Sequence, residues 1–193
     1  MRMVKDKYKT WLPYAGIPLV LAALLLARAD RIDVFVLLWY SLVVVFGYVA
    51  AVLDVKIRKI PNNLVLVMLG AWILTMAPKL LIDTGAAVVL LLDALLGFAV
   101  GGGLFLLVYF VSRKGLGGGD VKFMAAVGLY VGFSGTMTSM LYGTILAALT
   151  GLVLILTKKL GRKDPMPLAP FIYIGILITV FFQVTGGNYI ETL

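Results

Sequence analysis

Long apolar stretches separated by short polar connections run along most of this 193-residue chain. Several stretches reach the roughly 20 residues that an α-helix needs to cross a bilayer. They cover residues 11–28, 33–53, 62–77, 86–111, 121–133, 136–157 and 167–185. The fifth stretch is short for a span, so the pattern predicts six or seven crossings. The predicted fold class is an all-α integral membrane protein, a bundle of transmembrane helices.

The composition agrees with this pattern and narrows the chemistry. Hydrophobic residues make up 62% of the chain and charged residues 13%, whereas about a quarter of the residues in a soluble domain are charged. The absence of cysteine and histidine excludes disulfides, thiolate chemistry and the commonest zinc ligands. We therefore expect carboxylates to be the reactive groups, with no metal and no cofactor.

The distribution of Lys and Arg predicts the orientation of the helices. Most of the 17 basic residues lie in the N-terminal segment and in the alternate connections 54–61, 112–122 and 158–166. The positive-inside rule places these parts in the cytoplasm. The alternation of basic and non-basic connections requires the fifth stretch to cross the membrane, which favours seven helices. The protein is then expected in the plasma (inner) membrane, with its C-terminus outside. The net charge of +8 does not indicate nucleic-acid binding, because the basic residues form short loop clusters and no basic tail.

The first stretch has a second interpretation. A basic start, an apolar run and "LLLARAD" resemble a signal peptide with a cleavage site before Asp30. Removal of this segment would leave the orientation of the other helices unchanged, so the charge pattern does not decide between the two.

Acidic residues inside apolar stretches are functional candidates, because an ionised group in lipid is costly. Most of the nine acidic residues lie in loops or tails, where we expect solvated charges: Asp6, Asp30, Asp33, Asp83, Asp164 and Glu191. Asp93 lies well inside the fourth stretch. We expect it to hydrogen-bond a Ser, Thr or Tyr of a neighbouring helix as a neutral acid, with a proton-relay role as the alternative. The nearby G-x-x-x-G of Gly97 and Gly101 predicts close helix packing.

Asp54 and Asp120 lie at the predicted cytoplasmic ends of their stretches. Asp54 follows the second apolar run and precedes three cations, so an interfacial ion pair is its simplest role. Pro61 then breaks the connection, and Asn62 or Asn63 can cap the next helix. Asp120 closes the run "GLGGGD", and its simplest role is that of a helix N-cap.

A joint role for Asp54 and Asp120 explains more. Two carboxylates within a few ångströms cannot both ionise cheaply, so one keeps a proton near neutral pH. The ionised carboxylate can take a proton from water, while the protonated one polarises a peptide carbonyl and later donates to the leaving amine. The glycines before Asp120 let the loop approach an extended peptide. Phosphate binding fits less well, because the run lacks the Lys-Ser/Thr of a phosphate loop and the strand of a dinucleotide fold.

Spaced sequence blocks carry a resemblance to a known family. "GGGD" at 117–120 fits the G-x-G-D signature of membrane aspartyl proteases. Together with "DVKIRKIPNNLVL", "GLGGGDVKFMAAVGLYVG" and "MPLAPFIYIG", it makes residues 33–185 resemble the type IV prepilin peptidases and the related archaeal preflagellin peptidases. The resemblance implies that Asp54 and Asp120 are the catalytic pair. The positions that it implies as support are Gly117, Gly119, Lys122, Pro61, Asn62, Pro167 and Pro170.

The resemblance also implies a division of the chain and a substrate. Residues 1–32 would form a basic segment and an N-terminal helix, and 33–193 a six-helix peptidase core. The substrate would be a prepilin, pseudopilin or archaellin precursor, which loses its short basic leader at the cytoplasmic face. Larger bacterial members carry a cysteine-containing cytoplasmic insertion and also methylate the new N-terminus. This chain has no cysteine, so we do not expect methyltransferase activity.

Two other interpretations stay open. A presenilin-like or signal-peptide-peptidase-like protease shares G-x-G-D but cuts within the bilayer with acids deeper in its helices. A transporter could use Asp54, Asp93 and Asp120 as a proton or cation path. Against the transporter stand the absence of inverted repeats and the placement of two of the acids at one face.

Overall fold

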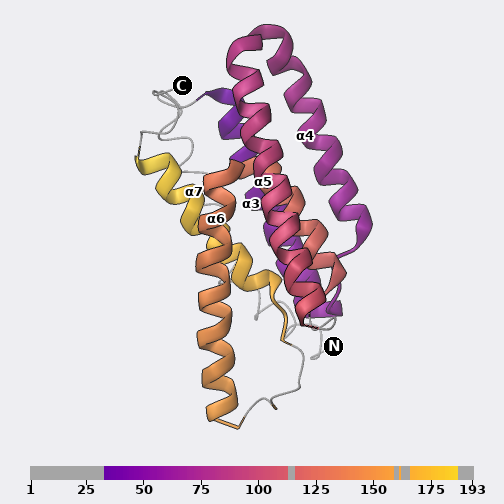
Figure 1. Ribbon diagram of the computed structural model, residues 1–193, viewed down its shortest axis with the longest axis vertical. Helices are drawn as coiled ribbons and strands as arrows, with labels where there is room; N and C mark the ends of the chain where they lie inside the picture. The colour runs from indigo at the N-terminus through magenta and orange to yellow at the C-terminus, as the bar shows by residue number, and fades with distance from the viewer. Residues whose placement is uncertain (1–32, 113–115, 159–160, 162–165, 187–193) are drawn as a thin grey trace, which may run out of the picture.

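Five helices make up the part of the chain that the computed structural model describes, which covers residues 33–112, 116–158, 161 and 166–186. They are α3 (Val34–Ile57), α4 (Asn62–Ile82), α5 (Thr84–Val111), α6 (Gly118–Leu156) and α7 (Ala169–Gly186). Figure 1 shows them as an elongated bundle, and no strand occurs within these ranges. The predicted all-α class is confirmed, whereas the first predicted stretch and its signal-peptide alternative lie outside the described residues.

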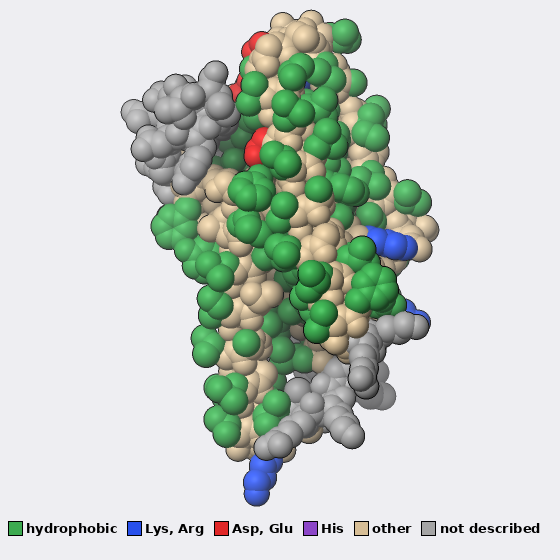
Figure 2. Space-filling view, in the orientation of Figure 1, with side chains coloured by type: hydrophobic (Ala, Val, Ile, Leu, Met, Phe, Trp, Pro, Cys, Tyr) green, Lys and Arg blue, Asp and Glu red, His purple; other side chains and the backbone are tan. Residues whose placement is uncertain are grey.

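The helices α3, α4, α5 and α6 are each long and apolar enough to cross a membrane, and α7 adds a shorter apolar helix. Their outer faces expose large hydrophobic side chains such as Leu74 and Leu81, which are 75% and 87% exposed. Figure 2 shows hydrophobic side chains spread over the whole length of the visible face. Soluble proteins rarely expose so much contiguous apolar surface, so this surface fits a lipid environment.

The fifth and sixth predicted stretches are two parts of α6. Gly132 interrupts the helix with a φ of 69° and a ψ of −173°. Met124 before it and Thr136 after it both lie against Gly101 of α5, so the chain changes direction at this point. The predicted count of seven separate spans is not confirmed, because the described residues contain four long candidate spans and one shorter apolar helix.

Asp93 of α5 stabilises the bend in α6. Its Oδ1 accepts a 3.1 Å hydrogen bond from the main-chain N–H of Phe133, and it therefore caps the second part of α6. A Cβ at Gly132 would overlap Asp93 Oδ2, so both the positive φ and the close contact require glycine there. The expected Ser, Thr or Tyr partner was wrong, because the interrupted helix offers main-chain donors instead.

The predicted close packing at the G-x-x-x-G motif is confirmed. A Cβ on Gly97 would overlap the carbonyl oxygen of Gly128 in α6, and a Cβ on Gly128 would overlap that of Gly97. A Cβ on Gly101 would lie 2.7 Å from the carbonyl oxygen of Met124. The backbones of α5 and the first part of α6 therefore touch along this face.

The helix ends that flank the connections predicted to be cytoplasmic lie towards one end of the bundle. Figure 1 places the end of α3, the start of α4, the end of α5, the start of α6, the end of α6 and the start of α7 in its lower half. On the face shown in Figure 2, the clearly visible basic side chains lie from the middle of the molecule to its lower end, and the acidic ones lie in its upper part. This arrangement agrees with the alternation of basic connections along the sequence, while the membrane side that each end faces stays a prediction.

Candidate functional site

Asp54 lies inside α3 and is buried. The helix continues to Ile57, four residues beyond the predicted end at residue 53, and only 6% of Asp54 is exposed. The sequence placed Asp54 just after the helix, beside cations, but the partner of its Oδ2 is the main-chain N–H of Ala169 at 2.9 Å. Asp54 is therefore held by a backbone donor that lies 115 residues further along the chain.

The donor belongs to the first residue of α7. Phe171 and Ile172 both donate main-chain hydrogen bonds to the carbonyl oxygen of Leu168, which fixes the start of the helix at Ala169. The first amides of a helix have no acceptor within it, and Asp54 satisfies one of them. Pro170, the second helical residue, has no N–H that would need a partner. Pro167 lies in the segment that leads into this turn.

Asp120 lies in the first turn of α6 as its third residue. The N-cap is Gly117, so the expected N-cap role of Asp120 was wrong; its main-chain N–H instead donates to the Gly117 carbonyl at 3.1 Å. The Oδ1 of Asp120 is buried and has no hydrogen-bond partner among the described residues. Asp120 and Asp54 interact electrostatically, so the structure brings the two predicted carboxylates together.

The two defined glycines of the G-x-G-D motif lie against neighbouring groups. A Cβ on Gly117 would lie 2.7 Å from Asp120 Oδ2, and a Cβ on Gly119 would lie 3.0 Å from the carbonyl oxygen of Ile60. Ile60 belongs to the connection between α3 and α4. By contrast, a Cβ on Gly118 would meet nothing within 4 Å. The glycines at 117 and 119 therefore allow the start of α6 to pack against the connection that follows Asp54.

A hydrogen bond joins α4 to α6 beside this packing contact. Lys122 Nζ donates to Asn62 Oδ1 at 3.0 Å. Asn62 is the first residue of α4, and Pro61 occupies the N-cap position without a side-chain cap hydrogen bond. The expected capping role of Asn62 or Asn63 was therefore wrong. Asn62 and Lys122 instead hold the beginnings of α4 and α6 together.

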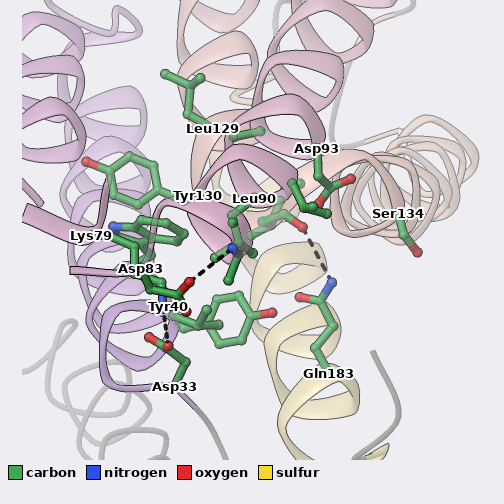
Figure 3. Close-up of a pocket in the computed structure, with 18 residues that line it drawn as sticks. Asp33, Tyr40, Lys79, Asp83, Leu90, Asp93, Leu129, Tyr130, Ser134 and Gln183 are labelled. Atoms are coloured by element: carbon green, nitrogen blue, oxygen red, sulfur yellow. Dashed lines mark hydrogen bonds and ion pairs between the residues drawn. The ribbon is translucent and has the colours of Figure 1, made fainter. Parts of the chain in front are cut away.

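A second polar cluster lies at the opposite end of α3, around a cavity of about 460 Å³ (Figure 3). Lys79 is only 4% exposed, and its Nζ lies 2.6 Å from Asp33 and 3.5 Å from Asp83. Asp33 caps α3 through the N–H of Phe35, and Asp83 caps α5 through the N–H of Ala86. The expectation of a simple solvated charge was wrong for Asp33, because α4 continues through Pro78 and carries Lys79 to it, whereas the Asp83 side chain remains 51% exposed beside the same lysine.

Opposing effects act on the pKa of Asp33 in this second cluster. Partial burial alone would raise the pKa of Asp33, but hydrogen bonds from Lys79 and the Phe35 N–H, with the Lys79 charge, hold it below its ordinary value. Asp93 lines the same cavity. The acids of this cluster have structural partners: Asp33, Asp83 and Asp93 each accept a hydrogen bond from a main-chain N–H at the start of a helical segment.

The fold and the site define an all-helical membrane protein with two interacting aspartates at helix ends. The profile described as "Type IV leader peptidase family" matches residues 41–156. The chain belongs to this family, as the resemblance of its sequence blocks predicted.

Similar proteins bear the name prepilin leader peptidase/N-methyltransferase. The one from Bacillus subtilis (strain 168) is 28% identical over 171 residues, which cover 88% of this chain and 66% of the relative. The one from Pectobacterium carotovorum subsp. carotovorum is 32% identical over 160 residues, which cover 78% and 52%. The chain thus spans about half to two thirds of the length of these relatives. No solved structure shows a significant match.

Proposed function

We propose that this chain is a membrane-embedded aspartic endopeptidase that removes the short basic leader of a prepilin-like precursor at the cytoplasmic membrane face. The observation that carries the proposal is the pairing of Asp54 and Asp120 in a member of a leader peptidase family. The substrate class comprises prepilins, pseudopilins and archaellin precursors, in which a basic leader precedes an apolar helix. The lipid bilayer holds that helix beside the enzyme.

The proposed reaction is hydrolysis by a pair of carboxyl groups that share one proton. The ionised carboxylate takes a proton from water as the water oxygen attacks the peptide carbonyl carbon, while the protonated one hydrogen-bonds the carbonyl oxygen. The protonated carboxyl then gives its proton to the amine nitrogen, and the C–N bond breaks as the C=O bond re-forms. The proton taken from water then passes from the first carboxyl group to the second, which restores the starting protonation of the pair.

The position of the pair favours surface cleavage over the presenilin-like alternative. Asp54 lies in the last turn of α3 and Asp120 in the first turn of α6, both next to connections rather than near the middle of a helix. The transporter alternative gains no support from Asp93, which caps α6 and lines the cavity at the other end of α3. We limit the proposal to the peptidase activity, since the cysteine-containing insertion expected for methylation has no counterpart in a chain without cysteine.

The proposal is tested with the full-length protein purified into liposomes and offered a prepilin-like precursor. We expect time-dependent loss of the precursor and the appearance of a shorter apolar product, measured by gel mobility and mass. A protein that leaves the precursor intact and instead takes up protons or cations across the liposome membrane would support the transporter interpretation and contradict ours.

Ala substitutions at neighbouring glycines test the packing of the site. Gly119→Ala should lower kcat/KM by about tenfold or more, because its Cβ would press on the Ile60 carbonyl and shift the turn that carries Asp120. Gly118→Ala is the matched control, since the added Cβ meets nothing within 4 Å. Both variants are compared by initial cleavage rates and thermal unfolding. Equal activities would show that the contact at Gly119 does not position Asp120.

A further inference from the structure

The two carboxylates of the proposed site have different surroundings. Asp54 Oδ2 accepts the 2.9 Å hydrogen bond from Ala169. A backbone contact with Gly117 favours the charged form of Asp120, but Asp120 Oδ1 is buried and has no hydrogen-bond partner within the described ranges. A donor hydrogen bond stabilises an ionised carboxylate, whereas a buried carboxyl oxygen without a donor favours the neutral form. The negative charge of the pair therefore belongs on Asp54 and its proton on Asp120.

The start of α7 strengthens this asymmetry. Ala169 is wholly buried and Asp54 is 6% exposed, so little water screens their contact. The positive end of a helix dipole acts on both acids, since Asp120 lies in the first turn of α6 and Asp54 lies against the start of α7, so the difference between them rests on the Ala169 hydrogen bond. α7 itself contains no charged residue. The charged groups on the neighbouring elements at this end are Lys56, Arg58, Lys59, Asp120 and Lys122.

We infer that the main-chain amide of Ala169 is a positioning group that keeps Asp54 ionised, so that Asp54 is the general base and Asp120 the general acid. This inference rests on the proposed function. Asp54 takes the proton of the attacking water, and Asp120 gives its proton to the leaving amine nitrogen as the C–N bond breaks. The proton on Asp54 then passes to Asp120. The "MPLAP" segment thereby gains a chemical role, because its backbone selects the base.

Two replacements at residue 169 remove the donor in different ways. Incorporation of lactic acid in place of Ala169 exchanges the N–H for an ester oxygen without a change in side-chain size. Ala169→Pro also lacks the N–H, and proline fits the first helical position. Unlike the ester, it keeps Leu168 as an amide carbonyl, which accepts the hydrogen bonds of the first turn of α7. Ala169→Val is the matched control for proline, since it adds similar bulk and keeps the N–H.

We expect the ester and proline variants to lower kcat by about 10- to 100-fold, the range for a hydrogen bond to a charged group, with KM nearly unchanged. The acid limb of the kcat/KM profile should move to higher pH in both, because the ionised base has lost its donor. Ala169→Val should keep the wild-type pH profile. A merely structural role for Ala169 would lower activity in all three variants without moving the acid limb.

The opposite assignment predicts a different result. If Asp54 were the general acid, loss of the donor would move the alkaline limb to higher pH and leave the acid limb in place, which would overturn the inference. Unchanged activity and pH profile in the ester variant of an active enzyme would also overturn it, while leaving the proposed peptidase intact. A folded wild-type protein that cuts no precursor would overturn both.

Discussion

Replacement of either Asp54 or Asp120 by Asn should lower precursor cleavage by about 10²- to 10⁴-fold, the usual contribution of a positioned acid or base. Asn has nearly the size of Asp but can neither take the proton of water nor supply one to the amine. The two effects should not add in the double variant, because the carboxyls work as one proton-sharing unit.

Asp93→Asn is the matched control for both substitutions. It removes a carboxyl group that lies inside an apolar helix, but Asn caps helices about as well as Asp, so the hydrogen bond to Phe133 can persist. We expect this variant to remain folded and to cleave the precursor at close to the wild-type rate. The measurement is the single-turnover rate in liposomes, with thermal unfolding as a check on folding. Near wild-type activity of both Asp54→Asn and Asp120→Asn would remove the basis for the proposed pair.

Gly97→Ala should destabilise the bundle by about 1–3 kcal/mol or more, the range for overpacking a tight interface. Its Cβ would overlap the Gly128 carbonyl oxygen and lie 2.7 Å from the carbonyl carbon of Gly132. Both contacts are with backbone, which cannot move aside as the end of a flexible side chain can. We also expect lower cleavage activity. The first part of α6 packs on α5 at Gly97, and its first turn contains Asp120.

Gly103→Ala on the same helix is the control for Gly97→Ala. Gly103 has nothing within 4 Å of an added Cβ, and alanine in a helix is favoured over glycine by about 0.5–1 kcal/mol. Gly103→Ala should therefore unfold at the wild-type temperature or slightly above it, as measured by circular dichroism in detergent. If Gly97→Ala proved equally stable, α5 and α6 would not depend on this backbone contact.

Much of the framework could be predicted from local sequence signals. Continuous apolar runs predict helices because lipid offers no partners for open backbone groups, and this gave the class and most of the helix positions. The spacing of Gly97 and Gly101 predicted a close helix contact. Asp54 and Asp120 were singled out because carboxylates at the ends of apolar runs need an explanation.

The remaining features depend on contacts between distant parts of the chain. The buried Asp54 is satisfied by a donor at Ala169, which no local pattern around Asp54 reveals. Lys79 follows Pro78, a residue that usually ends helices, yet α4 continues and the lysine pairs with Asp33 and Asp83. The bend at Gly132 likewise depends on Asp93 from another helix. The Asp54–Ala169, Lys79–Asp33 and Asp93–Phe133 contacts each join residues that are far apart in the sequence, whereas the Lys79–Asp83 pair joins neighbours one helical turn apart.

The position of the cut bond tests the central claim most directly. Purified wild-type protein in liposomes is given a precursor with a basic, glycine-containing leader, and the masses of both products are determined. A leader peptidase that uses Asp54 and Asp120 at the membrane surface should cut one bond, between the leader and the apolar helix, and the Asp54→Asn and Asp120→Asn variants should not. Cleavage within the apolar helix, or an intact precursor after exposure to the folded wild-type protein, would contradict the account.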